Sequence, residues 1–271
     1  MNVFRSLSLF TLLLASACAG PGADEVVAWR SHEAIARPLE QRGQLAVEVA
    51  AVESARQADD LARARRLALS LAAENPQDPS VQLLASRAES DGLFLFEESD
   101  KESRNLAALS ALHYASDAFT LGAQGGPASA QLAWTMGTTT HLQPMFERAA
   151  HARRTLETAQ RALSEQADEP TALATLAIVH LRLQTLPWIA DLMAFGAPDS
   201  SLEEAESFAR RACEARPSRE NKLILAKVLV AADKRDAARR ELESALAAPV
   251  QFPRDTVLEA QVRKLREQLA D

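Results

Sequence analysis

Apolar residues near the end of this chain recur with the period of an α-helix. Leu258, Val262, Leu265 and Leu269 stand at i, i+4, i+7 and i+11, and the positions between them are mostly charged or polar. Such a stripe buries one face of a helix and leaves the rest solvated. We expect this helix to cap the end of a larger helical structure.

The same period runs through the middle of the chain, where Leu106, Leu109 and Leu112 recur at core spacing. Segments in which Val, Ile and Thr alternate with polar residues, the pattern of half-buried strands, are absent. Ala and Leu dominate the composition, and only 9 residues are Gly. These patterns predict an all-α fold.

Capping residues mark where the helices begin. Asp78 precedes a proline, and Ser99 and Ser200 each stand three residues before a glutamate, as in a capping box. These boundaries and the apolar spacing predict helices at 26–36, 39–56, 59–74, 79–96, 101–121, 128–138, 143–166, 170–184, 201–215, 219–232, 235–247 and 254–270.

The helices carry the tetratricopeptide (TPR) pattern, a helix pair of about 34 residues with small residues at the helix crossing. The clearest copy runs from Leu225 to Pro249, and a second from Leu176 to Pro217 holds about 16 inserted residues between its helices. We therefore expect one TPR-like α-solenoid over residues 26–271, with degenerate repeats at 80–166. The alternative is a generic Ala-rich bundle. The small or apolar positions of the copies are Ala64, Ala68, Leu71, Ala177, Ala205, Ala209, Ala212, Ala226, Ala238, Leu242 and Ala245.

The N-terminus has the pattern of a bacterial lipoprotein leader. A basic residue, Arg5, precedes a short apolar segment that ends in small residues and Cys18. The sequence predicts a signal peptide at 1–17, acylation of Cys18 by palmitate-like chains and a lipid-anchored tether at 18–25. Because Ala19 is uncharged, the outer membrane, facing the periplasm, is the expected location. The alternative is an ordinary signal cut near Ala17.

Charge argues against a nucleic-acid partner. The formal net charge is −7, and loss of Arg5 with the leader makes the mature chain one unit more negative. Phosphate binding needs a concentrated basic face, whereas Lys and Arg are scattered here among acidic residues. We expect a solvated, ion-paired surface.

No enzyme motif is present. The sequence lacks a phosphate-binding Gly-Lys-Ser/Thr loop, a His-Glu-x-x-His pair and a Gly-x-Ser-x-Gly turn. The histidines are dispersed, so we expect no metal site and no cofactor. Cys213, the thiol that remains if Cys18 is acylated, lies beside the packing residue Ala212, which favours a structural role.

The insert of the second repeat copy, residues 185–200, is the strongest candidate for binding. Its apolar residues are either packed on the solenoid as an extra helix or used on a partner. Trp134 is a further candidate groove anchor, with core packing as the alternative, and His180 lies on the helix that leads into the insert. The candidate residues inside the insert are Trp188, Ile189, Leu192, Met193 and Phe195.

Residues from about 167 to 269 resemble bacterial TPR proteins related to the regulator of microtubule dynamics family. A weaker resemblance, to the TatT lipoproteins that accompany TRAP-type solute transporters, rests on Cys18 and the helical repeats alone. Neither extends over residues 80–150. The matching residues are Ala177, Ile178, Val179, His180, Leu186, Pro187, Trp188, Phe195, Gly196, Ala197, Pro198, Leu202, Glu203, Glu204, Ala205, Asn221, Leu225, Ala226, Pro253, Arg254 and Asp255.

These resemblances imply an interaction or ligand-holding module without catalysis. The favoured function is a cell-envelope scaffold that binds protein partners on a concave repeat surface. The alternative is a transport accessory protein that holds a small apolar ligand between its helices. A scaffold predicts an open groove lined by polar and basic side chains, and a ligand carrier predicts an enclosed apolar cavity.

Overall fold

The computed structural model describes residues 39–58, 60–185, 198–248 and 255–269, and in these ranges the regular structure is entirely helical. Every helix expected from residue 39 onward is present, with ends shifted by a few residues. The helix expected at 26–36 lies outside the described residues. The observed elements are α2 (Leu39–Gln57), α3 (Leu61–Glu74), α4 (Pro79–Gly92), η2 (Leu93–Leu95), α5 (Lys101–Thr120), α6 (Gly126–Thr139), η3 (Thr140–Leu142), α7 (Met145–Glu165), α8 (Pro170–Thr185), α10 (Leu202–Ala215), α11 (Arg219–Ala231), α12 (Arg235–Ala247) and α13 (Asp255–Gln268).

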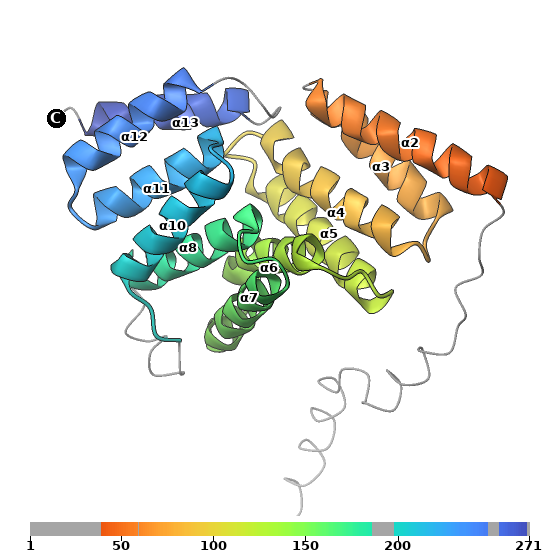
Figure 1. Cartoon of the computed structure of the whole chain (residues 1–271), viewed down its shortest axis with the longest axis horizontal. Helices are drawn as coiled ribbons and strands as arrows, with labels where there is room; N and C mark the ends of the chain where they lie inside the picture. The colour runs from red at the N-terminus through yellow and green to blue at the C-terminus, as the bar shows by residue number, and fades with distance from the viewer. Residues whose placement is uncertain (1–38, 59, 186–197, 249–254, 270–271) are drawn as a thin grey trace, which may run out of the picture. The chain divides into compact units, whose positions relative to one another are not determined.

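Within the compact unit of residues 42–271, the helices form consecutive antiparallel pairs (Figure 1). The first members are α2, α4, α6, α8 and α11, here called the inner layer, and the second members are α3, α5, α7, α10 and α12, the outer layer. Along the chain each outer helix packs on the inner helix that follows it, and α13 packs on α11 and α12. The expected TPR-like solenoid is confirmed, and residues 80–166 form two complete pairs.

The small residues of the repeat pattern lie where the helices cross. The alanines at these positions are at most 1% exposed, so two helix backbones approach closely through them. A core cluster of the C-terminal pairs joins the alanines from Ala177 onward to leucines such as Leu225, Leu229 and Leu242. The buried alanines are Ala64, Ala68, Ala177, Ala205, Ala209, Ala212, Ala226, Ala238 and Ala245.

The interpretation of the α5 leucines was wrong. Leu106 is 62% exposed and Leu109 is 45% exposed, while the alanines at 107, 108, 111, 115 and 118 are buried. The physical reason is the same close crossing: α5 lies between α4 and α6, and only its alanine face lets both neighbours approach.

Helix caps fall close to the expected positions. Asp78 accepts from the backbone N–H groups of Ser80 and Val81, as the sequence predicts. The caps of α5 and α10 lie one residue later than expected, at Asp100 and Ser201, where each side chain accepts from a backbone N–H three residues on. At α10 the Ser201 hydroxyl also donates to the carboxylate of Glu204, so the Ser and Glu of the expected motif interact one position later than predicted.

The C-terminal helix buries its apolar stripe, with Leu258, Val262 and Leu269 in the core. It is also held by Arg219 of α11, which is only 3% exposed. The guanidinium donates to the backbone oxygens of Ala245 (3.1 Å), Ala248 (3.0 Å) and Asp255 (2.7 Å), and so joins α11, the end of α12 and the start of α13. None of the described helices is long and apolar enough to cross a membrane.

Candidate functional site

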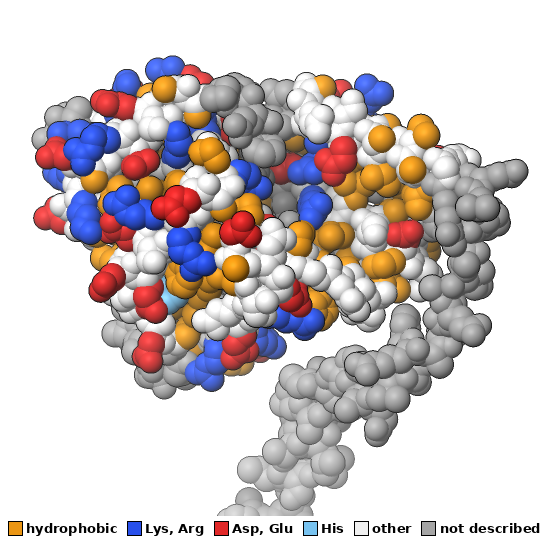
Figure 2. Space-filling model, viewed as in Figure 1, with side chains coloured by type: hydrophobic (Ala, Val, Ile, Leu, Met, Phe, Trp, Pro, Cys, Tyr) orange, Lys and Arg blue, Asp and Glu red, His pale blue; other side chains and the backbone are white. Residues whose placement is uncertain are grey.

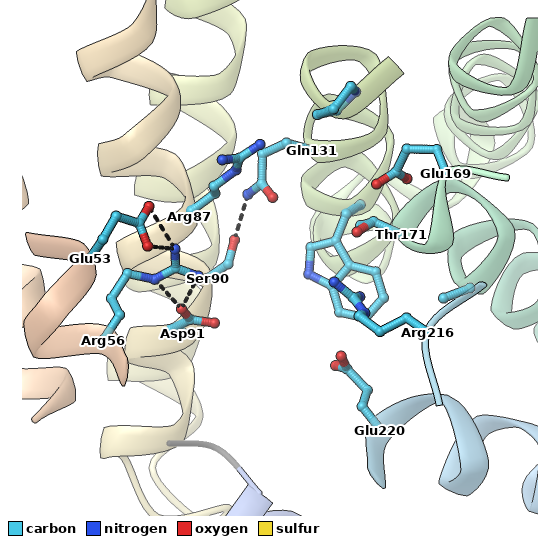
Figure 3. A pocket seen from close by; sticks show the side chains of 13 residues that line it. Glu53, Arg56, Arg87, Ser90, Asp91, Gln131, Glu169, Thr171, Arg216 and Glu220 are labelled. Atoms are coloured by element: carbon cyan, nitrogen blue, oxygen red, sulfur yellow. Dashed lines mark hydrogen bonds and ion pairs between the residues drawn. The ribbon is translucent and has the colours of Figure 1, made fainter. Parts of the chain in front are cut away.

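The inner layer surrounds a cavity of about 380 Å³ (Figure 3). One wall comes from α2 and α4, and the other from α6, α8, α11 and the segment before α11. The cavity lies where α4 and α6 contact each other less extensively than α6 and α8 do. Seven of its lining residues are charged: Glu53, Arg56, Arg87, Asp91, Glu169, Arg216 and Glu220.

The first wall is a closed ion network centred on Arg56 of α2. Its Nε lies 2.8 Å from Oδ2 of Asp91 on α4, and its Nη1 lies 2.9 Å from Oε2 of Glu53 on the same helix. Two carboxylates therefore engage this guanidinium, which leaves little capacity for a further anion. The network also fixes α2 against α4.

Gln131 of α6 links the two walls. Its Nε2 donates to the hydroxyl oxygens of Ser86 and Ser90 on α4, both at 3.0 Å, and Ser86 in turn donates to the carbonyl of Ala111. All three polar side chains are buried, and such satisfied networks hold neighbouring elements in one register. The network thus holds α4 and α6, and the cavity residues that they carry, in a fixed position relative to each other.

Glu169 forms part of the opposite wall and caps α8. Its Oε2 accepts from the backbone N–H of Ala172 at 2.6 Å. Burial raises the pKa of the Glu169 carboxyl above its usual value near 4.5, although the Ala172 N–H and the charge of Arg216 oppose that shift. The negative charge of this wall is therefore sensitive to pH.

Replacing Glu169 by Gln should change how stability depends on pH. A raised folded-state pKa means that the folded chain binds the proton more tightly than the unfolded chain does. The contribution of Glu169 to stability is therefore full below its unfolded pKa and is lost as pH rises through its folded pKa. Glu169→Gln keeps an oxygen acceptor for Ala172 without titrating. We expect the stability of wild type relative to the variant to fall from pH 4 toward neutrality, measured by urea unfolding.

The matched control is Glu165→Gln on α7. Hydrogen bonds from Arg161 and Ser129 hold the pKa of the Glu165 carboxyl below its usual value. Its contribution is therefore present above its unfolded pKa and is lost as pH falls, which gives the opposite slope. Two variants with the same pH dependence would contradict this assignment.

Arg87 of α4 points from the first wall into the cavity, toward Gln131 (Figure 3). Burial, and next the charge of Arg56, lower the pKa of its guanidinium, and the nearby carboxylates of Glu53 and Glu169 oppose that shift. Within the described ranges, Arg87 makes no hydrogen bond or ion pair. It is the cation that this geometry leaves available to a ligand.

The sequence candidates divide into three groups. Trp134 lines the cavity and also packs against the core, so the structure places it where a groove anchor was expected. Its binding role stays a prediction. Cys18 and the insert residues Trp188, Ile189, Leu192, Met193 and Phe195 lie outside the described residues. The ends of the insert are joined, because Nε2 of Gln184 donates to the carbonyl and hydroxyl oxygens of Ser200, both at 2.9 Å.

His180 lies apart from the cavity, buried between α8 and α10. Its Nδ1 is 3.4 Å from Oε2 of Glu204, and its ring centroid is 5.6 Å from that of Phe208. Burial lowers the pKa of the imidazole and outweighs the opposing charge of Glu204. A neutral, packed ring fits a structural role better than a ligand contact.

Cys213 is also structural. Burial raises the pKa of its thiol to about 12, so the reactive thiolate is not formed near neutral pH. Among the residues that the structure describes, no group of three or more His, Cys, Asp or Glu side chains is arranged to hold a metal ion.

The charged residues of the cavity were missed from the sequence. Arg56, Arg87 and Glu169 belong to three different segments and look like the other charged residues of amphipathic helices. A usable signal existed only for Glu169, which directly precedes the proline that begins α8 and therefore stands near a helix start.

Comparisons with known proteins agree with this fold. The family model described as Regulator of microtubule dynamics protein 1-3 matches residues 48–270. The match confirms the resemblance drawn from residues 167–269 and extends it over residues 80–150. A search of curated proteins finds no match.

Among solved structures, a thermophilic TPR protein of Thermus thermophilus is similar, with a TM-score of 0.56 and 14% identity over 82% of this chain and 97% of that one. At this identity the likeness shows the fold alone. YrrB, described as a TPR protein with an unusual peptide-binding site, gives a TM-score of 0.38 at 14% identity over 80% of this chain and 90% of its own. A human IFIT1 dimer with PPP-AAAA gives 0.41 at 16% identity over 71% and 47%.

Proposed function

The chain belongs to the regulator of microtubule dynamics protein 1-3 family, and from this premise we propose that it is a non-enzymatic scaffold that binds a partner protein on its inner layer. TPR-like helix pairs present a continuous surface to extended segments of other proteins. We further propose that the scaffold works in the cell envelope, anchored by lipid at Cys18.

The observation that carries the scaffold proposal is the charged cavity of the inner layer. Residues from five inner helices or their ends line one hollow, and most of the lining side chains are polar or charged. An apolar ligand held between helices needs the opposite lining. The cavity therefore favours a polar partner segment over the small apolar ligand of the transport alternative.

Charge on the surface supports a protein partner over a nucleic acid. Figure 2 shows acidic and basic side chains intermixed over α10 to α13 on the visible face. Two exposed cations of the inner layer, Arg182 on α8 and Lys227 on α11, act on each other, and the acids Glu98 and Glu220 act on Lys227. Strong phosphate binding needs a basic surface without such acids.

Reversing charge on the inner helices α8 and α11 should abolish partner capture. The test variant is Arg182→Glu with Lys227→Glu, and the matched control is Arg154→Glu with Arg240→Glu, two exposed arginines of the outer helices α7 and α12. Tagged proteins are used to capture partners from detergent-solubilised envelopes of the cells that express them, and mass spectrometry identifies the partners. We expect a partner retained by wild type and control and lost by the test variant. Equal capture by all three proteins would overturn the inner-layer proposal.

Cys18→Ala should release the protein from the membrane. Stable anchoring needs two acyl signals, and the cysteine is the residue that would carry them. We expect the wild type in the outer-membrane fraction, with incorporation of labelled palmitate, and the variant in the soluble fraction without label. Cys213→Ala is the matched control, because it removes the other thiol and should stay with the membrane. A wild-type protein that takes up no labelled fatty acid contradicts the anchor.

A further inference from the structure

We infer that the inner-layer cavity is a carboxylate site in which Arg87 binds the carboxylate and Trp134 packs against the group that bears it. This inference rests on the proposed binding of a partner to the inner layer and names the chemistry recognised there. The carboxylate comes either from an acidic residue of a peptide segment or from a small organic acid.

The first step of the argument is the difference between two arginines of the cavity. Arg56 is engaged by Asp91 and Glu53. Arg87 is partly buried beside it and makes no hydrogen bond or ion pair to any residue in the described ranges. Carboxylates lie near Arg87, but none in the described part of the chain is in hydrogen-bonding contact with it, and a guanidinium withdrawn from water without such a contact is unfavourable. A ligand anion that pairs with it directly relieves that cost. Arg87 is therefore placed to receive one.

The second step concerns which anion fits. A guanidinium presents paired N–H donors that match the two oxygens of a carboxylate. The carboxylates of Glu53, Asp91 and Glu169 all act on Arg87, so negative charge already surrounds the position. A doubly charged phosphate would be repelled by these groups more strongly than a singly charged carboxylate.

The third step concerns the rest of the ligand. Trp134 lines the cavity from α6, in the wall that faces α2 and α4, and its ring offers an apolar face with a polar edge. Gln131 links the two walls of the cavity, because its amide nitrogen donates to Ser86 and Ser90. Its amide oxygen makes no hydrogen bond to the described residues and is free to accept a ligand N–H. A ligand whose carboxylate lies close to an amide group can pair with the guanidinium of Arg87 and donate its N–H to the amide oxygen of Gln131.

The experiment uses the full chain and follows the arginine Nε–H and tryptophan indole N–H signals by NMR, which detects weak binding directly. The probes are a capped pentapeptide with one internal Glu (acetyl-Ala-Ala-Glu-Ala-Ala-amide), its Gln counterpart, N-acetylglutamate and inorganic phosphate. The variants are Arg87→Met, which keeps the aliphatic stem, and Arg87→Lys, which keeps the charge. Arg154→Met is the matched control on the outer layer.

We expect the Glu peptide or N-acetylglutamate to shift the signals of Arg87 and Trp134, with at least tenfold weaker binding to Arg87→Met and intermediate binding to Arg87→Lys. The Arg154→Met control should bind as wild type does. Tighter binding of the Glu peptide assigns the carboxylate to a peptide, and tighter binding of N-acetylglutamate assigns it to a small acid. Equal binding of the Gln peptide, preference for phosphate, unchanged binding to a folded Arg87→Met protein, or no shift with any probe would overturn the inference.

Failure of this inference is distinguishable from failure of the proposed function. If Arg87→Met still captures a partner that the Arg182→Glu, Lys227→Glu variant loses, the scaffold stands and the carboxylate site falls. If the acids bind at Arg87 but no partner depends on the inner layer, the site stands and the scaffold falls.

Discussion

Arg219→Met should be among the most destabilising single substitutions in the C-terminal half of the chain. The change removes donors from the carbonyls of Ala245, Ala248 and Asp255, two of which lie at or just beyond the end of α12. Each buried carbonyl left without its donor costs about 1–3 kcal/mol of unfolding free energy, and this substitution affects three of them. Because repeat units depend mainly on their neighbours, we expect α13 and α12 to loosen first. Hydrogen exchange and limited proteolysis should show that order.

The matched control is Arg263→Met, which removes another arginine partner of the same carboxylate. Glu259 pairs with Arg219 at 3.3 Å and with Arg263 at 2.6 Å, but the Arg263 side chain is 54% exposed. Exposed pairs of this kind contribute about 0–1 kcal/mol. A similar loss in the two variants would show that the Glu259 ion pair, and not the backbone hydrogen bonds of Arg219, holds the C-terminal helix.

Arg65→Met should also cause a large loss of unfolding free energy, and adding Glu89→Met should reverse much of that loss. Arg65 of α3 donates from Nε and Nη2 to the two oxygens of Glu89 on α4, at 3.0 and 3.2 Å, and Glu89 is only 1% exposed. The single variant leaves a buried carboxylate without this partner, which costs about 3 kcal/mol. Removing both charges, in Arg65→Met with Glu89→Met, leaves no charge to desolvate and should restore most of the loss.

Guanidinium chloride unfolding of the single and double variants compares the cost of leaving the Glu89 charge without Arg65 with the cost of removing both charges. The control pair is Arg161 and Glu165 on α7, an exposed i,i+4 pair in which Arg161→Met should cost well under about 1 kcal/mol. A double variant less stable than Arg65→Met alone would mean that the side chains are retained for packing and not as a charge pair.

The helices were predictable because their signals are local. Capping groups such as Asp78 and the apolar period of α13 depend only on residues a few positions apart. The crossing alanines were also predictable, because TPR pairs repeat the same small positions, and alanines such as Ala205 and Ala238 are fully buried. Asn221 was named from the sequence only for its family resemblance. The structure shows its role, because its side chain donates to the carbonyls of Ala212 and Arg216 at the end of α10.

The α5 leucines show where a local period misleads. Leu106 and Leu109 have core spacing, yet the neighbouring helices cover the alanine face of α5 instead. Helical spacing identifies candidate faces, but only the neighbours decide which face is buried. When a helix packs between two others, the buried face is the one that lets the backbones approach most closely. A face of small residues such as alanine allows a closer approach than a face of leucines.

The sequence by itself determined the helices, the small residues at their crossings and the all-α repeat class, since each follows from contacts within one helix or one repeat. Only the tertiary structure decided that Arg56, Arg87, Gln131, Trp134 and Glu169 surround one cavity. The charged ones, Arg56, Arg87 and Glu169, come from segments far apart in the chain and resemble ordinary solvated charges in the sequence. The same holds for Arg219, whose role depends on carbonyls at the far end of α12. Electrostatic and hydrogen-bonding partners across a repeat stack are set by distance in space, and amphipathic periodicity carries no information about that distance.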